Sequence, residues 1–163
     1  MNLKRKVVIF AVMMITAFTF TTHVMADDLY VVASKATQKA VQNWLGFLES
    51  KEIIVEVVTP EAFADHKMEK YIVIIGSISE QGGIADIAKE ALKGDEFQSV
   101  NEAGKGRMFM KSGVWNPGQE VILIVGHDQK DADDARKAAK EEWFEMFSQW
   151  FEIEEGAEGL HAY

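Results

Sequence analysis

Short runs of Val, Ile and Leu alternate along this chain with longer stretches whose apolar positions recur every three or four residues. The short runs are typical of strands buried on both faces, and the longer stretches are typical of helices that cover a sheet. The runs predict strands at residues 29–33, 52–58, 71–75, 107–111 and 120–125. The amphipathic stretches predict helices at residues 34–51, 81–93 and 129–153, and a polar stretch predicts a surface loop at residues 95–106.

These elements follow one another in the order βαββαββα, which predicts the α/β class. We expect a mixed, mostly parallel five-stranded sheet with helices on both faces. The last two strands are joined by residues 112–119, which contain the turn sequence Asn116-Pro117-Gly118. This connection is too short for a parallel crossover, so these strands should form an antiparallel hairpin. Residues 107–111 alternate in polarity, which favours the edge of the sheet.

The chain begins with the basic triplet Lys4-Arg5-Lys6, an apolar run at residues 7–22 and a small residue, Ala26. This pattern predicts a secretory signal peptide over residues 1–26. The apolar run is shorter than the roughly 20 residues that cross a bilayer, so an uncleaved membrane anchor is the less favoured alternative. We therefore expect an exported protein, periplasmic, secreted or on the cell surface. It should have a single α/β domain at residues 27–155 and a flexible C-terminal tail at residues 156–163.

Composition narrows the range of partners. The chain has no cysteine, so no disulfide can form despite the expected export. Its net charge is −9, and because residues 1–26 contain three basic and no acidic residues, the remainder carries −12. Such a charge repels phosphate backbones, which argues against a nucleic-acid partner. A divalent cation, a basic partner protein or no charged partner at all stay open, and no cofactor motif is present.

Two strand ends carry the candidate ligand-binding residues. Gly76, Ser77 and Ser79 follow one predicted strand, and His127 and Asp128 follow another. Ligands of open α/β sheets bind at the carboxyl ends of strands, although an ordinary strand-to-helix turn is the favoured interpretation of the first group. Ser77 lacks the flanking glycines of a nucleophile elbow.

Asp128 begins the last predicted helix, and three more aspartates follow within its first two turns. Asp128 is expected to cap the helix, and the other carboxylates complement the positive end of its dipole. A cation site formed by His127 with two or three of the carboxylates of Asp128, Asp131, Asp133 and Asp134 is the alternative interpretation.

The second half of the last helix is rich in aromatic residues: Trp143, Phe144, Phe147, Trp150 and Phe151. They cover more than one face of the predicted helix, which indicates either deep burial or a surface offered to a partner. We interpret them as a contact surface for an envelope protein or for self-association. Core packing, sugar stacking and membrane contact stay open.

Residues 71–139 resemble the small α/β module of archaeal surface-layer proteins and related cell-envelope proteins. The stretches that carry the match are YIVIIG, GKGRMFM, WNPGQEVILIVGHD and DADDARKA, and the matching positions are Gly76, Gly104, Gly106, Pro117, Gly126 and Asp128. A similar layout occurs in non-catalytic N-terminal domains of some carbohydrate-active hydrolases. The resemblance implies a scaffolding or accessory domain without catalytic residues.

The sequence thus favours a non-enzymatic, envelope-associated interaction module that uses the aromatic helix as its contact surface. A protein that binds a small ligand or a carbohydrate at the strand ends near Gly76 and Gly126 is the alternative. A hydrolase with unrecognised carboxylates is the third class. Contact with a membrane is expected only through an uncleaved signal.

Overall fold

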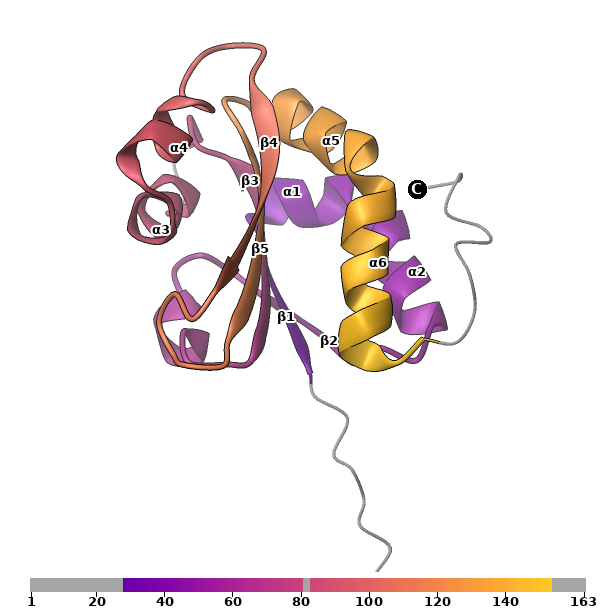
Figure 1. Cartoon of the computed structure of the whole chain (residues 1–163). Coiled ribbons are helices and arrows are strands. Elements are labelled where there is room, and N and C mark those ends of the chain that lie inside the picture. The colour runs from indigo at the N-terminus through magenta and orange to yellow at the C-terminus, as the bar shows by residue number, and fades with distance from the viewer. Residues whose placement is uncertain (1–27, 81–82, 154–163) are drawn as a thin grey trace, which may run out of the picture.

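The computed structural model describes residues 28–80 and 83–153 (Figure 1). The expected signal peptide at residues 1–26 and the tail at residues 156–163 lie outside this part of the chain. The described residues form an α/β fold around one five-stranded sheet, as predicted. Its strands are β1 (Leu29–Val32), β2 (Val55–Val58), β3 (Tyr71–Ser77), β4 (Gly106–Ser112) and β5 (Glu120–Gly126).

The strands lie in the order β2-β1-β3-β5-β4. β1 pairs in parallel with both β2 and β3, and β3 pairs in parallel with β5. β4 runs antiparallel to β5 at one edge, which confirms the predicted hairpin. Every residue of β3 is buried because this strand has a neighbour on both sides and helices over both faces.

Helices cover both faces of the sheet (Figure 1). We call the faces the aromatic face and the aliphatic face. Over the aromatic face lie α1 (Lys35–Ala40), α2 (Gln42–Ser50), α5 (Gln129–Ala138) and α6 (Lys140–Phe151). Over the aliphatic face lie the 3₁₀ turn η1 (Phe63–His66), α3 (Ile84–Ala91) and α4 (Gly94–Gln98).

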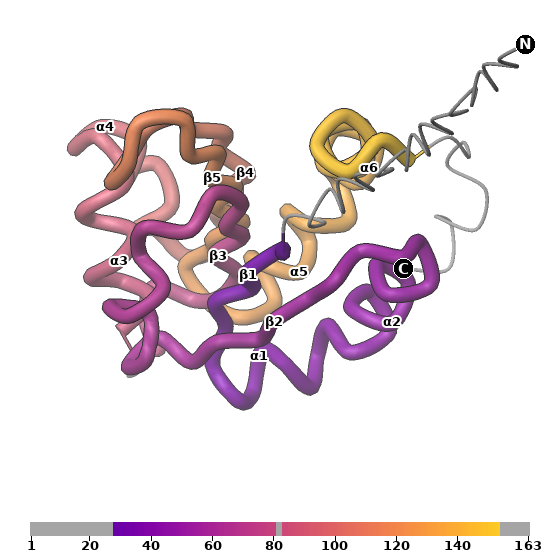
Figure 2. Tube along the Cα trace, turned by 90° about the horizontal axis from the view of Figure 1, so that it is seen from below, coloured from indigo at the N-terminus to yellow at the C-terminus, as the bar shows by residue number. Residues whose placement is uncertain are grey.

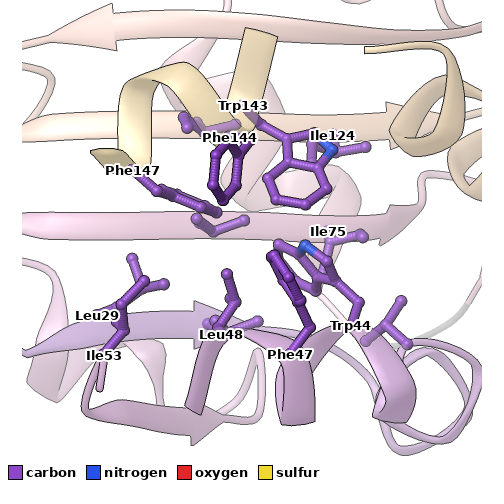
Figure 3. Packing of buried hydrophobic residues seen from close by; sticks show 14 of the residues in the cluster. Leu29, Trp44, Phe47, Leu48, Ile53, Ile75, Ile124, Trp143, Phe144 and Phe147 are labelled. Carbon is purple, nitrogen blue, oxygen red and sulfur yellow. The ribbon is translucent and has the colours of Figure 1, made fainter. Parts of the chain in front are cut away.

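The core under the aromatic face joins α2 and α6 to the sheet (Figure 3). Trp44 and Phe47 project from α2 and meet Trp143 from α6, with ring centroids 5.6 and 6.5 Å from that indole. Beneath these rings lie Ile75 of β3 and Ile124 of β5, both fully buried. Burial of large aromatic side chains stabilises this face by both apolar area and ring geometry.

Two of the predicted helices are bent into separate segments. The stretch from residue 129 to 153 divides at Ala139, with backbone angles of φ −95° and ψ 17°, into α5 and α6. The stretch from residue 34 to 51 divides in the same way at Val41. Helical hydrogen bonds continue through both bends, since the amide of Ala139 donates to the carbonyl of Ala135 at 3.0 Å. The bend at Ala139 lets α5 follow β4 and β5 while α6 turns towards α2 (Figure 1).

The loop expected at residues 95–106 also differs from the structure. Its first residues form the short helix α4, whose amino end is closed by the Glu96 carboxylate accepting from the amide of Lys93 at 2.8 Å. The last residue of the expected loop, Gly106, already belongs to β4.

Candidate functional site

The strand order creates a topological switch point between β1 and β3. From β1 the chain passes through α1 and α2 on the aromatic face to β2, whereas from β3 it passes through α3 on the aliphatic face. The chain therefore leaves two neighbouring parallel strands in opposite directions, and the carboxyl ends of strands at such a point are where open α/β sheets bind ligands. Ser34 follows β1 at this point, and Ser77 ends β3.

A chain of polar side chains spans the switch point. The Ser34 hydroxyl donates to the Glu80 carboxylate at 3.3 Å and lies 3.0 Å from the Thr37 hydroxyl. Thr37 in turn donates to the Gln129 side-chain oxygen at 2.6 Å. These contacts link the residues after β1, β3 and β5, so three connections that are distant in sequence meet at one place.

The predicted ligand-binding residues all lie at the carboxyl ends of β3 and β5, and hydrogen bonds join the two loops that carry them. These residues are Gly76, Ser77, Ser79, His127 and Asp128. The amides of Ile78 and Ser79 donate to the carbonyls of Gly126 and His127 at 2.9 and 3.1 Å. The two strand ends therefore lie side by side. The hydrogen bonds of Ser34, Thr37, Glu80 and Gln129 place these four residues in the same cluster.

Ser77 has a structural role in this cluster. Its side chain is only 1% exposed, and its hydroxyl donates to the backbone carbonyl of His127 at 2.9 Å. The same oxygen accepts hydrogen bonds from the amides of Ser79 and Glu80 at 3.1 and 3.2 Å. The Ser77 hydroxyl donates its proton in a hydrogen bond to a carbonyl oxygen and not to a general base. Ser77 is therefore not arranged as a nucleophile.

The close packing of helices against the strand ends depends on bare glycine positions. A Cβ on Gly126 would lie 2.3 Å from the backbone nitrogen of Ala132, and one on Gly106 would lie 2.0 Å from the carbonyl oxygen of Asp131. α5 therefore begins directly against the backbones of β4 and β5. On the other side of the cluster, Gly76 has a φ of 150°, and a Cβ there would lie 3.2 Å from the Thr37 hydroxyl.

Asp128 caps α5, as predicted: its carboxylate accepts from the amide of Asp131 at 2.9 Å. The other three carboxylates of the hypothetical cation site each have a partner of their own. Asp131 accepts from the amide of Gly104 at 2.9 Å, and Asp134 pairs with Lys130 at 2.5 Å. The cation-site interpretation therefore has no support in the structure, since the four carboxylates point to separate partners.

Asp133 is the most strongly held of these carboxylates. Burial raises its pKa, but hydrogen bonds and ion pairs with Lys137 at 2.6 Å and Arg136 at 2.9 Å outweigh burial, so the pKa lies below its usual value. Asp133 thus stabilises the middle of α5 and does not face the cluster at the switch point.

Two polar atoms of the cluster are buried without a hydrogen-bond partner in the described part of the chain. One is Nε2 of Gln129, whose side-chain oxygen is already bound by Thr37, and the other is Nδ1 of His127. Buried polar atoms without a partner are rare in proteins, because each costs about 1–3 kcal/mol. Both atoms lie at the carboxyl end of β5, next to the hydrogen-bonded side chains of Ser34, Thr37 and Glu80.

Three of the five aromatic residues of α6 are core residues, which corrects the expected contact surface at those three positions. Trp143, Phe144 and Phe147 are buried, because α6 lies over the sheet and faces α2. Trp150 and Phe151 are half-buried, and both rings pack on Tyr71 with centroids 5.0 and 5.1 Å away. The first three residues therefore have no surface to offer a partner.

Among the described residues there is no group of three or more histidine and carboxylate side chains placed to hold a metal ion. No helix in residues 28–80 and 83–153 has the length and apolar character needed to span a bilayer.

No protein-family model, curated protein or solved structure matches this chain. Its function is therefore inferred from its own residues and geometry.

Sequence reasoning missed half of the cluster for an identifiable reason. Ser34 is the first residue of the helix predicted at residues 34–51, and it caps α1 by accepting from the amide of Thr37 at 3.2 Å. Its second role, the contact with Glu80, depends on β1 and β3 being neighbours, which the strand runs alone do not specify. The signal that could have found it is its position directly after the first strand.

Proposed function

We infer that this protein is a non-enzymatic accessory protein that binds a small, neutral, hydroxyl-rich ligand, such as a sugar, at the switch point between β1 and β3. The observation that carries this proposal is the contact between Ser34 and Glu80, because it brings polar side chains together where α/β folds bind ligands. The unpartnered Gln129 nitrogen next to it supports the proposal, since a ligand oxygen would satisfy that donor.

The side chains of the cluster suit hydroxyl groups better than phosphate. Ser34 and Ser79 offer hydroxyls, Gln129 offers an amide donor, and Glu80 offers a carboxylate that accepts from a ligand hydroxyl. The negative charge of Glu80, together with a net chain charge of −9, disfavours an anion. A neutral polyol or sugar is the ligand class that matches donors, acceptors and charge.

Two further points support a binding role without catalysis. The Ser77 hydroxyl is used on a backbone carbonyl, and the aspartates at the start of α5 are used in capping and ion pairs. These groups hold loops and a helix in place, which is what a rigid binding site requires.

The proposed location is the cell envelope or the exterior. It rests on the signal-like residues 1–26 and on the resemblance of residues 71–139 to surface-layer modules. An envelope protein that binds carbohydrate is consistent with both features.

The test is titration of the full chain with a panel of neutral mono- and disaccharides, followed by calorimetry or by thermal unfolding. A sugar present at a hundredfold excess over its Kd should raise the free energy of unfolding by about 2.7 kcal/mol. Glu80→Gln replaces a charged acceptor with a weaker neutral one, and Gln129→Ala removes an amide donor, so each should weaken binding by about tenfold, or about 1.4 kcal/mol. Glu145→Gln, an exposed carboxylate on α6, is the matched control and should bind as the wild type does.

Two results would count against the proposal. One is that no sugar in the panel changes the thermal unfolding of the wild-type chain. The other is a sugar that binds with the same affinity to the wild type, Glu80→Gln and Gln129→Ala, because its site would then lie elsewhere.

A further inference from the structure

The two edges of the sheet expose apolar side chains. Four large apolar side chains of the described residues are strongly exposed, and three of them lie at these edges. Ile54 and Val57, 53% and 39% exposed, belong to the β2 edge, and Met110, 51% exposed, belongs to β4. β2 and β4 form opposite margins of the sheet (Figure 2). Exposed apolar side chains on unpaired strand edges are typical of surfaces that add another strand.

The free edge of β4 is defined by its pairing with β5. The amide of His127 donates to the carbonyl of Lys105, and the amide of Gly113 donates to the carbonyl of Gln119. Hydrogen-bonded and non-bonded pairs alternate along an antiparallel ladder. The odd-numbered residues of β4 between Lys105 and Gly113 therefore hydrogen-bond to β5. The residues with even numbers direct their amides and carbonyls outwards: Gly106, Met108, Met110 and Ser112.

The free edge of β2 follows from the same reasoning. The carbonyl of Ile54 accepts from the amide of Leu29 in β1 at 2.8 Å. The carbonyl of Val58 accepts from the amide of Ala33, directly after β1, at 3.0 Å. Residues alternate in a parallel ladder too, so Val55 and Val57 direct their amides and carbonyls away from β1. No hydrogen bond to these outward groups of β2 or β4 occurs within the described residues.

The two edges carry opposite charges. Residues 103–119, which include β4, contain three basic residues and no acidic residue, although the whole chain is acidic. Lys111 is paired with Glu96, whereas the exposed side chains of Lys105 and Arg107 have no partner among the described residues. Near β2 the charge is negative. Tyr30 of β1 lies beside Glu56 of β2, and its pKa is raised first by burial and then by the negative charges of Glu69, Glu56 and Asp28.

We propose that β4 of one copy of this chain pairs antiparallel with β2 of a second copy, so that the sheet continues from one molecule into the next. The occupant of the β4 edge is thus the oppositely charged β2 edge of the same protein. This interface is independent of the ligand site, which lies at the carboxyl ends of the inner strands.

The side chains of the two edges match when the backbones pair. In an antiparallel ladder, residues that exchange hydrogen bonds stand opposite each other with side chains on the same face. The outward residues of both strands have their side chains on the aromatic face. On β2, Val55 and Val57 pair with Leu29 and Val31, which belong to the core under that face. On β4, Met108 packs against the same core. Val57 of one copy therefore meets Gly106, Met108 or Met110 of the next.

On the aliphatic face the same pairing brings opposite charges together. Glu56 lies on this face beside Tyr30, and Arg107 and Lys111 lie on it beside Phe109. Three registers satisfy the outward groups of both valines, and they place Glu56 opposite Arg107, Phe109 or Lys111. In the register with Phe109, basic residues lie on both sides of it on the same face of β4. Opposite charges across a strand pair stabilise it, whereas β4 paired with β4 brings like charges close together.

The pairing is head-to-tail, because each copy uses two different edges. Such a contact does not close on itself after two copies and extends into a linear assembly. Only four residues of β2 take part, so the contact is weak and depends on concentration. Because the charged groups lie at the surface, about 1 M salt, which reduces the Debye length to about 3 Å, should weaken the assembly.

The test is sedimentation velocity of the full chain between about 1 µM and 1 mM, a range that covers weak association. The N-terminal segment is kept identical in every variant, so that any contribution from it is common to all. Arg107→Glu and Glu56→Lys should each weaken association by about tenfold, since each replaces an attraction with a repulsion. The double variant should recover the wild-type association, and Lys39→Glu, an exposed α1 residue with the same change of charge as Arg107→Glu, should behave as the wild type.

A second pair of variants separates backbone pairing from simple charge attraction. Met110→Pro removes one outward amide without breaking the hydrogen bonds between β4 and β5, and should reduce association by at least tenfold. Met110→Ala keeps the amide and should reduce it less. A wild-type chain that stays monomeric throughout, or association that survives Met110→Pro and both charge reversals, would overturn the proposal.

Discussion

The indole rings of Trp44 and Trp143 meet edge to face, with centroids 5.6 Å apart and an interplanar angle of 81°. The two residues lie on different helices, α2 and α6, and both are almost fully buried. The Trp143 ring also donates its N–H to the carbonyl of Arg136 at 3.0 Å. This pair therefore joins α2 to the last helix of the aromatic face and fixes α6 in the core.

Replacement of Trp143 should destabilise the fold strongly. Trp143→Ala leaves a large cavity between α2 and α6 and should lower the free energy of unfolding by about 3–5 kcal/mol. Urea unfolding followed by far-UV circular dichroism measures this change. Trp150→Ala, at a half-buried position on the same helix, is the control and should cost less than half as much. Equal costs at the two positions would contradict the burial pattern of α6.

Two glycine-to-alanine substitutions should act in opposite directions. Gly126→Ala places a methyl group 2.3 Å from the Ala132 backbone, forces α5 away from the sheet, and should cost about 1–3 kcal/mol or more. Gly46→Ala lies inside α2 with nothing within 4 Å, and should stabilise the protein by about 0.5–1 kcal/mol. Thermal unfolding of both variants beside the wild type tests the prediction, and a stabilised Gly126→Ala would show that α5 does not pack as described.

The role of Ser77 can be separated from that of its neighbour Ser79. Ser77→Ala removes the acceptor of two amides and the donor to the His127 carbonyl, and should lower the free energy of unfolding by about 1–3 kcal/mol. Ser79→Ala, at an exposed position, should change it by no more than about 0.5 kcal/mol. The two variants are compared by chemical denaturation. A Ser77→Ala chain as stable as the wild type would mean that the hydroxyl does not hold the loop.

The ion pairs of Asp133 should make stability depend on pH in the acidic range. Its pKa is lower in the folded chain than in the unfolded chain, so its contribution is present above about pH 3.9 and is lost as pH falls through the folded value. Asp133→Asn should therefore lower the free energy of unfolding by about 0.5–1 kcal/mol at pH 7. The difference from the wild type should shrink as the pH falls through the folded value.

Urea midpoints measured from pH 2 to 7 for both chains give this difference directly. Asp86→Asn serves as the control, because the Asp86 side chain is exposed and its contact with Lys89 is long, at 3.6 Å. If the effect of Asp133→Asn stayed constant across the range, the ion pairs with Lys137 and Arg136 would not be the source of its stabilisation.

The fold could be predicted largely because burial leaves a direct trace in the sequence. β3 and β5 are buried on both faces and consist almost wholly of Val, Ile and Leu, and the short turn before β5 required β4 to be antiparallel. The bends at Val41 and Ala139 could not be predicted, since neither proline nor glycine marks them. They arise from the way each helix follows the sheet and then packs on its partner helix.

The candidate site was predicted only in part for a related reason. Residues such as Gly76 and Asp128 were identified because they directly follow strong strand signals. Glu80 and Gln129 carry no local signal, and their importance comes from contacts with Ser34 and Thr37, which are distant in sequence. The aromatic residues of α6 show the converse. Their number on one helix indicated a contact surface, but α2 supplies the aromatic partners that bury Trp143, Phe144 and Phe147.

The bare backbones of Gly106 and Gly126 stand opposite each other on adjacent strands, and the first turn of α5 rests on both. Neither position tolerates even a methyl group unless the helix is lifted, so a chain that keeps this arrangement has to keep both glycines while its other residues drift. A divergent homologue should consequently be recognisable by this pair, followed by a helix-capping aspartate two positions after the second glycine, long after overall sequence identity has faded.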